Sequence, residues 1–361
     1  MSSCTSQQSS WPKSNPFSAN KLQSIDQLKK ISGKKSTQIV YNGNLSGELS
    51  TCGCAIGPKG GLERRLNFLV NNKMLSSPIV LDAGNALFTT AKISKNNQSM
   101  AQSNALKILK AHKKMGVQAQ NVGYLDLSLG IDFLQKNMSS FLVSSNIVNL
   151  KGEPIFSTHK KIKEANGQLW VLGLSDPGAH KNNKGYKLLD PQKTIEKWMK
   201  KIPKQDQLVV LSDLEVNTIE KIAQQNNRAI VFIESRSLGS LQEAQHVAQS
   251  IRLRTQLQGQ EWGVIELIWS PKGSAWLNPD KQQLLSKRFS QLDKDYQYLQ
   301  QQEKSSDRKS EITRLLASLE KIKKYAPQSS KAKSNAIFYK NKLYPLTDKY
   351  AGKNELSSMM N

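Results

Sequence analysis

Residues 79–85 read Ile79-Val80-Leu81-Asp82-Ala83-Gly84-Asn85, a short apolar run that ends in a polar turn containing glycine. An apolar run of this length between turns is typical of a buried strand. Thr37–Tyr41 before it and Ala119–Val122 after it have the same character. Residues 60–71 and 99–115 lie between these strands, and their apolar side chains recur at helical spacing. The alternation predicts an α/β fold with its binding loops at the strand ends.

The same pattern continues to about residue 270. It predicts further helices over Thr194–Lys201 and Asn217–Gln225, and further strands over Phe141–Ser144, Leu169–Leu174, Leu208–Ser212, Ala229–Glu234 and Trp262–Trp269.

The ends of the chain differ from this body. After Pro279, Gln282–Glu303 and Asp307–Tyr325 show only helical spacing, and the break between them predicts an antiparallel helical hairpin. Residues 1–36 are mostly polar and predict a disordered tether. We therefore expect an α/β domain over residues 37–275 and a hairpin with a tail over residues 276–361.

Composition excludes several classes of protein. The 361 residues carry a net charge of +24, and 37% of them are hydrophobic. No run reaches the roughly 18 apolar residues of a membrane-spanning helix. Three cysteines are too few for a disulfide scaffold or an array of zinc fingers. The charge is mostly lysine without a nucleic-acid motif, so it does not favour nucleic acid and instead favours an anionic membrane or cell-wall surface.

Cys4 is followed by a polar spacer, as in a bacterial lipoprotein after cleavage, although the charged and apolar parts of a signal peptide are missing. If Cys4 follows a signal sequence, we expect a periplasmic, lipid-anchored protein. The alternative is an unused thiol in a cytoplasmic tail.

Seven strand-end loops carry a family resemblance. In order and spacing they resemble the motifs D-x-H-G, G-G-L-x-R, D-A-G-D, G-N-H-E/D, S-A-N, V-G-L/V and S-H-L-G of the UshA-like 5′-nucleotidase branch of the calcineurin-like metallophosphoesterases. The resemblance covers about residues 37–270 and implies a two-sheet α/β sandwich flanked by helices. The seven loops are Asn44–Gly47, Gly60–Arg65, Leu81–Asn85, Val122–Asp126, Ser144–Ile147, Val171–Leu174 and Leu211–Leu214.

This chain departs from the family at the positions of the metal ligands. A two-metal phosphatase needs a dense set of carboxylates and imidazoles to hold both ions and to make a hydroxide nucleophile. By the resemblance, the first Asp and His fall on Asn44 and Ser46, and the bridging Asp falls on Asn85. The Asn-His pair falls on Tyr124 and Leu125, and a later His falls on Asp213. The sequence therefore predicts that the ordinary two-metal centre is absent.

Cys52-Gly53-Cys54 lies in the loop before Gly60-Gly61-Leu62. It resembles a subset of bacterial UshA-like proteins in which the first Cys position can be selenocysteine, and this implies redox chemistry or a single soft metal. A bridge between cysteines so close in sequence is strained and easily reduced. Lys59, Arg64 and the following helix N-terminus favour thiolates. The alternative is a structural disulfide or a pair of spare thiols.

Three residues are the remaining candidates for binding at the same mouth: Asp126, Asp213 and Arg64. The other expectation for Arg64 and Arg65 is a solvated face with one pair that caps the core.

Three functions follow. The first is an extracytoplasmic protein that has lost the two-metal site and uses Cys52 and Cys54 for thiol redox or soft-metal binding, with an unknown redox or envelope protein as its partner. The second is a pure pseudoenzyme that serves as an envelope-anchored interaction module. The third is a residual metal-dependent phosphoesterase.

Overall fold

The computed structural model describes residues 11–12, 15–17, 24–32, 35–52, 57–137, 140–164, 167–180, 185–270, 273, 275–301, 306–323 and 336–360. Its helices are α1 (Ile25–Ser32), α2 (Leu62–Asn71), α3 (Gln98–Lys114), α4 (Ile131–Lys136), α5 (Pro191–Met199), α6 (Val216–Gln225), α7 (Pro279–Gln301), α8 (Ser306–Lys323) and α10 (Ser357–Met360). Among these residues, no helix has both the length and the apolar character needed to cross a bilayer.

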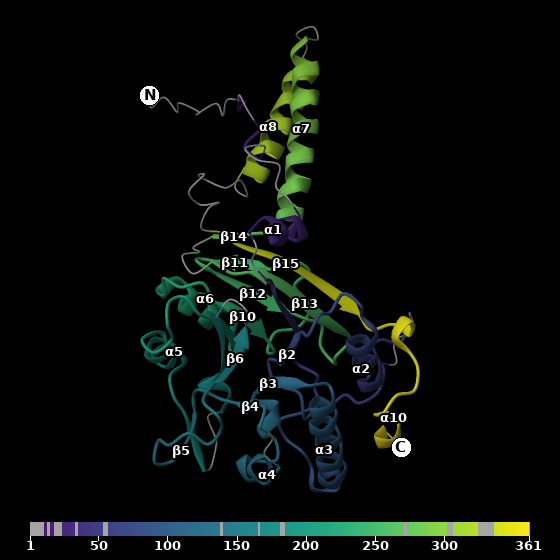
Figure 1. The fold of residues 1–361 in the computed structure, drawn as a ribbon, viewed down its shortest axis with the longest axis vertical. Coiled ribbons are helices and arrows are strands. Elements are labelled where there is room, and N and C mark those ends of the chain that lie inside the picture. The colour runs from purple at the N-terminus through teal and green to yellow at the C-terminus, as the bar shows by residue number, and fades with distance from the viewer. Residues whose placement is uncertain are drawn as a thin grey trace.

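Two large sheets form the body of the molecule (Figure 1). The seven-stranded sheet has the order β14-β15-β13-β1-β2-β3-β4, in which β1 to β4 are parallel. Its strands are β1 (Thr37–Asn42), β2 (Ile79–Asp82), β3 (Val117–Asn121), β4 (Leu142–Val143), β13 (Glu261–Ile268), β14 (Ala275–Leu277) and β15 (Ala336–Pro345).

The six-stranded sheet has the order β11-β12-β10-β9-β7-β6, with β7, β9, β10 and β12 parallel. A small third sheet pairs β5 (Ile147–Asn149) with β8 (Tyr186–Leu188). The strands of the six-stranded sheet are β6 (Lys160–Glu164), β7 (Gly167–Ser175), β9 (Gln207–Asp213), β10 (Val231–Glu234), β11 (Gln245–Val247) and β12 (Ser250–Arg254).

The core has three layers because each sheet is apolar on both faces. Between the sheets, side chains such as Ile39 and Leu81 pack against Val209 and Ile233. Helices α2 and α3 cover the outer face of the seven-stranded sheet, and α5 and α6 cover that of the six-stranded sheet. The predicted two-sheet α/β sandwich flanked by helices is confirmed.

The helical hairpin of α7 and α8 projects from one end of this body (Figure 1). The apolar side chains near its base enclose Phe17, which is 1% exposed. Trp11 stacks on Tyr296 of α7 with ring centroids 4.3 Å apart. The sequence predicts a disordered tether over residues 1–36, but its described parts include the helix α1 and side chains packed on the hairpin.

The chain returns to the body after the hairpin. The sequence predicts a tail there, but β15 enters the seven-stranded sheet between β13 and β14 and pairs with β13 from Glu261 to Ile268. Ile337 and Tyr339 point into the core between the sheets. Lysines between the apolar residues hide the strand pattern in the sequence. The position of β15 in the sheet is determined by pairing with strands distant in the chain.

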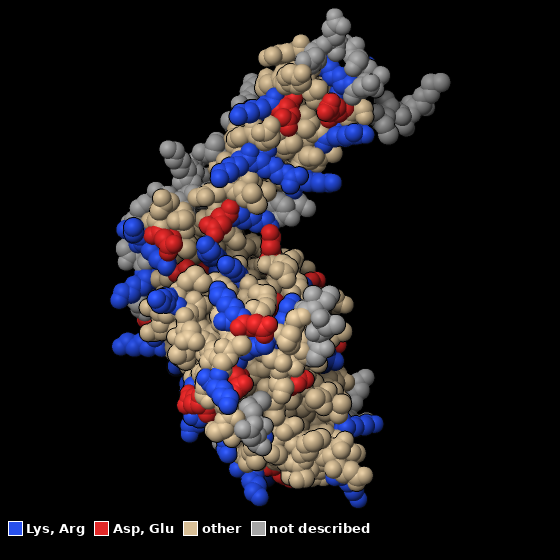
Figure 2. Space-filling view, turned by 90° about the vertical axis from the view of Figure 1, so that its right-hand side faces the viewer, with Lys and Arg blue, Asp and Glu red and all other residues tan. Residues whose placement is uncertain are grey.

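Lys and Arg are scattered over the face drawn in Figure 2, with Asp and Glu among them. This face of body and hairpin shows no single basic patch.

Candidate functional site

A pocket of about 520 Å³ opens where strands of both sheets end. Asn44 follows β1, Asn85 follows β2 and Tyr124 follows β3, all in the seven-stranded sheet. Asp213 ends β9 and Arg236 follows β10, both in the six-stranded sheet. Loops at the carboxyl ends of parallel strands commonly meet at such a site. We call this cavity the main pocket; it is lined by Asn44, Ser46, Asn85, Thr89, Tyr124, Leu125, Asp213, Arg236, Leu238, Leu257 and Gln258.

The main pocket therefore brings together six positions that the family resemblance aligns with metal ligands: Asn44, Ser46, Asn85, Tyr124, Leu125 and Asp213. Thr89, Leu238, Leu257 and Gln258 belong to no motif, and only the fold places them here.

Asn85 links the loops of the two sheets. Its Nδ2 donates to Asp213 Oδ1 at 2.7 Å, and its Oδ1 accepts from the backbone N–H of Leu125 at 2.9 Å. The approach is close enough that a Cβ on Gly123 would lie 2.5 Å from Asn85 Oδ1. A neutral amide thus both donates and accepts here, which a carboxylate cannot do.

Asp213 is fully buried and its oxygens are engaged. Oδ2 accepts from the backbone N–H of Tyr124 at 2.7 Å, and Oδ1 accepts from Asn85. Burial raises the pKa of Asp213 to about 7, while its hydrogen bonds and the charge of Arg236 oppose the rise. Arg236 is itself held by Glu215, with Nε and Oε1 2.6 Å apart, and by Asp176 at 3.6 Å.

Asp126 does not lie at the mouth of the main pocket, where the sequence predicts it. Its carboxylate accepts the backbone N–H groups of Asn85, Ala86, Leu87 and Gly123 at 2.8–2.9 Å. It is 1% exposed and does not line the main pocket. Burial raises its pKa to about 7 against these donors. Asp126 is a positioning residue for the loop after β2, because that turn leaves several N–H groups to satisfy.

Neither arginine of α2 forms a solvated face, and Arg64 does not reach the main pocket. Arg64 contacts the carbonyl oxygens of Pro58 and Leu346 and the carboxylate of Asp348, so it ties α2 to the segment after β15. Arg65 is fully buried with its guanidinium 3.9 Å from the ring centroid of Trp262. The helix turns this side toward the sheet, where the face of the Trp262 ring attracts the cationic guanidinium of Arg65.

Cys52 lies in a loop closed by an isolated bridge between Thr51 and Gly60. Its backbone N–H donates to the carbonyl of Lys59 at 2.8 Å, and its Sγ accepts the N–H of Lys59 at 3.3 Å. Cys52 does not line the main pocket. Cys54 and Cys4 lie outside the described residues, so the predicted pair of thiols stays a prediction.

The backbone around the main pocket is strained. Left-handed φ angles occur at Asn44 (60°), Ser46 (52°), Asn85 (55°) and Gln258 (59°). Elsewhere in the described chain, only Ser77 and Ala248 share this conformation among non-glycine residues. Each such residue costs of order 1 kcal/mol or more and is kept where surrounding structure enforces it. Four of the six non-glycine residues with this conformation in the described chain therefore line one pocket.

The donors of the main pocket do not fit a two-metal centre. Among the described residues that line it, Asp213 is the only carboxylate, and the other polar side chains are amides, hydroxyls and the guanidinium of Arg236. Within the described ranges, no group of three or more His, Cys, Asp or Glu residues is placed to hold a metal ion. Such a centre needs several anionic and imidazole ligands.

Comparison with known proteins gives matches among solved structures alone, since no family model and no curated protein matches. A 5′-nucleotidase precursor from Thermus thermophilus matches with a TM-score of 0.52 and 18% identity over 66% of this chain and 52% of its own. The calcineurin-like phosphoesterase YfkN from Bacillus subtilis matches with a TM-score of 0.51 and 15% identity over 65% of this chain and 85% of its own. The chain has the calcineurin-like phosphoesterase fold.

The NAD nucleotidase of Haemophilus influenzae has the same fold, with a TM-score of 0.54 and 14% identity over 66% of this chain and 48% of its own. The chain spans about half the length of each of these two nucleotidases. At these identities the likeness is one of fold.

Proposed function

We propose that this protein binds a small ligand in the main pocket and does not hydrolyse phosphate esters through a two-metal centre. The observation that carries the proposal is the hydrogen bond from Asn85 Nδ2 to Asp213 Oδ1 at 2.7 Å. It joins the two sheets directly, at positions where the family resemblance aligns metal ligands. The strained loops and the cavity of about 520 Å³ remain beside it and support a binding role.

An activity assay tests the first half of the proposal. The purified chain is incubated with Mn²⁺ or Zn²⁺ and with a generic phosphate ester or a nucleotide, beside an active 5′-nucleotidase as positive control. We expect no turnover that a chelator removes. Robust chelator-sensitive turnover would instead establish the residual phosphoesterase.

Ligand-observed NMR with a library of small fragments tests the second half. Leu238, which is 74% exposed at the pocket, is changed to Trp to narrow the opening. Leu150, which is 59% exposed elsewhere, is changed to Trp as the matched control. We expect fragments whose binding is lost in Leu238→Trp and kept in Leu150→Trp. If no fragment in the library binds in this way, the result contradicts the binding role.

A thiol function is the second candidate, in line with the resemblance to the Cys-Gly-Cys subset. The N–H of Lys59 donates to Cys52 Sγ, and a donor to sulfur favours the thiolate. In a Cys4→Ser background, we expect iodoacetamide to label Cys52 at neutral pH faster than the same thiol in denatured protein. Equal or slower labelling of the folded chain would contradict the thiol function, and the proposed redox partner would then have no support.

Lipid attachment at Cys4 and a periplasmic location are a separate proposal, supported by the polar spacer after Cys4. Mass spectrometry of the protein from its native cells tests it. A diacylglycerol-modified Cys4 at the mature N-terminus is expected, and an unmodified Cys4 within a longer soluble chain contradicts it.

A further inference from the structure

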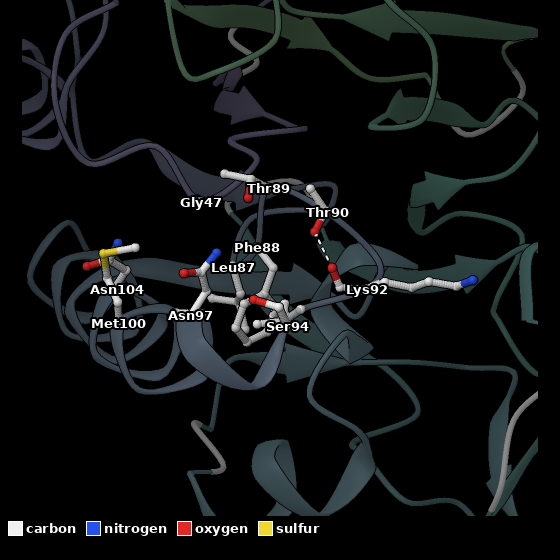
Figure 3. A pocket seen from close by; sticks show the side chains of 12 residues that line it. Gly47, Leu87, Phe88, Thr89, Thr90, Lys92, Ser94, Asn97, Met100 and Asn104 are labelled. Carbon is white, nitrogen blue, oxygen red and sulfur yellow. Dashed lines mark hydrogen bonds between the residues drawn. The ribbon is translucent and has the colours of Figure 1, made fainter.

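A second cavity of about 220 Å³ adjoins the main pocket. It lies between the loop after β2 and α3, and we call it the side pocket. Leu87, Phe88, Ile93 and Met100 give it an apolar lining, and Asn97 and Asn104 add amides (Figure 3). Thr89 lines both cavities. A molecule larger than the main pocket alone therefore has a neighbouring apolar space to enter.

The backbone at Ser46 and Gly47 packs closely on the loop after β2, next to Thr89, the residue that the two cavities share. The N–H of Ser46 donates to the carbonyl of Asn85, and the N–H of Gly47 donates to the carbonyl of Ala86, both at 2.9 Å. Gly47 has a φ of 71°, and a Cβ there would lie 3.1 Å from the backbone nitrogen of Thr89. A side chain at position 47 would press on the residue that the two cavities share.

The charged groups around the two cavities favour an uncharged ligand. The two charged side chains of the main pocket already have partners: Asp213 accepts from Asn85 and Tyr124, and Arg236 is paired with Glu215. In the side pocket, Lys92 extends away from the other labelled side chains (Figure 3). An ionic ligand would lose its hydration here without gaining an opposite charge.

Neutral groups remain to recognise a ligand. In the main pocket Ser46 Oγ donates to Asn44 Oδ1 at 2.7 Å, and Gln258 Oε1 accepts from Gln260 at 3.3 Å. The amide N–H groups of Asn44 and Gln258 and the lone pairs of the Ser46 hydroxyl are left for a ligand, and Thr89 adds a hydroxyl at the junction. Such groups both donate to and accept from the hydroxyls of an uncharged molecule. The apolar lining of the side pocket offers the complementary surface for a hydrocarbon group.

We propose that the two cavities together bind one uncharged amphipathic ligand, with a polyhydroxylated head in the main pocket and an apolar group in the side pocket. This inference rests on the proposed binding function and names its ligand class.

Calorimetric titration of the full chain with n-hexyl β-D-glucoside and with methyl β-D-glucoside tests the inference. Both probes share one neutral head, and the hexyl group adds methylenes for the side pocket. We expect the hexyl glucoside to bind at least about 10-fold more tightly, because those methylenes leave water. Equal affinities would overturn the side-pocket assignment and leave the proposed binding function standing.

The variant Met100→Glu tests whether the hexyl group binds in the side pocket. Met100 is 62% exposed, so the change is not expected to disturb folding, and it puts a carboxylate at the apolar cavity. Met74→Glu, at a methionine that is 59% exposed elsewhere, is the matched control. Met100→Glu should abolish the advantage of the hexyl glucoside and leave methyl glucoside binding unchanged, and Met74→Glu should change neither.

An unchanged advantage in Met100→Glu would overturn the assignment of the side pocket. If neither glucoside binds, the inference is overturned as a whole. The proposed function is then decided separately by the fragment experiment with Leu238→Trp.

Discussion

Asn85 shows how a single amide shapes this site. Its side chain donates to a buried carboxylate and accepts from a backbone N–H, so both its polar atoms are used. A carboxylate at the same position would set two like charges against each other in a buried place. The identity of this residue therefore decides whether the side chains at positions 85 and 213 attract or repel each other.

Asn85→Asp should destabilise the protein at about pH 8 by roughly 3 kcal/mol, because one buried carboxylate then faces another. At about pH 5 the loss should be smaller, since the pair can share a proton. Chemical denaturation at both pH values measures it. Asn96→Asp, at an exposed asparagine, is the control and should have little effect. A loss that is equal at both pH values would contradict the paired-charge explanation.

A second prediction concerns how the unfolding free energy depends on pH, and it rests on Asp213. Its pKa is raised from 3.8 to about 7 in the folded chain, so the folded state holds a proton that the unfolded state releases. The stability from that proton is present below about pH 4 and is lost as the pH rises to about 7. Asp213→Asn should remove this contribution, so its unfolding free energy should fall less steeply between about pH 5 and pH 8. A slope equal to that of the parent protein would place the proton elsewhere, with Asp82 and Asp126 as the other buried carboxyls of raised pKa.

Among the elements, β15 determines whether the body is complete. It pairs with β13 along the whole of that strand and with β14 on its other side. The hairpin leaves the body between β14 and β15 and has its own small apolar core around Phe17. The hairpin thus has a core of its own, although the base of α7 touches β15, where Lys340 Nζ lies 2.9 Å from Asp280 Oδ2.

Two deletions should separate their contributions. A chain that stops after Lys323 lacks β15, so we expect it to unfold or aggregate, because β13 becomes an exposed edge and buried Ile337 and Tyr339 are lost. Replacement of residues 279–335 by a Gly/Ser linker of about eight residues should keep the body folded. Circular dichroism and size-exclusion chromatography measure both. A linker variant that loses its strand signal would show that the hairpin is needed for the sheet.

For the whole molecule, hydrogen bonds hold together the loops at the pocket. Asn85 reaches Asp213 across the two sheets, and Asp126 holds the loop after β2 through four backbone N–H groups. The fold therefore has a source of rigidity at this place that does not depend on added ions.

Chelation should accordingly leave thermal stability unchanged. We expect the melting temperature with EDTA to stay within about 1 °C of that without it, because no carboxylate cluster in the described chain loses a metal partner. Differential scanning fluorimetry measures the shift, with a metal-dependent nucleotidase as control. A fall of about 5 °C or more, reversed by Mn²⁺ or Zn²⁺, would reveal a structural metal.

Local patterns in the sequence were sufficient for the α/β class, and the family resemblance supplied the two-sheet sandwich and the choice of pocket loops. The apolar run at residues 79–82 and its turn recur as β2 and the loop that carries Asn85. Strand periodicity is a local property, and in a parallel sheet the loops after successive strands open at one edge. Strand ends alone thus indicated where binding loops would lie, and the family resemblance singled out Asn44, Asn85 and Tyr124 among them.

Tertiary structure alone decided the rest. The carboxylate of Asp126 looks like a ligand in sequence, yet it is buried because four backbone N–H groups converge on it. Arg65 is buried against Trp262, a residue almost two hundred positions away. Gln258 reaches the main pocket and β15 enters the sheet through partners distant in the chain. Hydrogen bonding and burial between distant segments depend on the packed fold, and no local pattern of residue types encodes them.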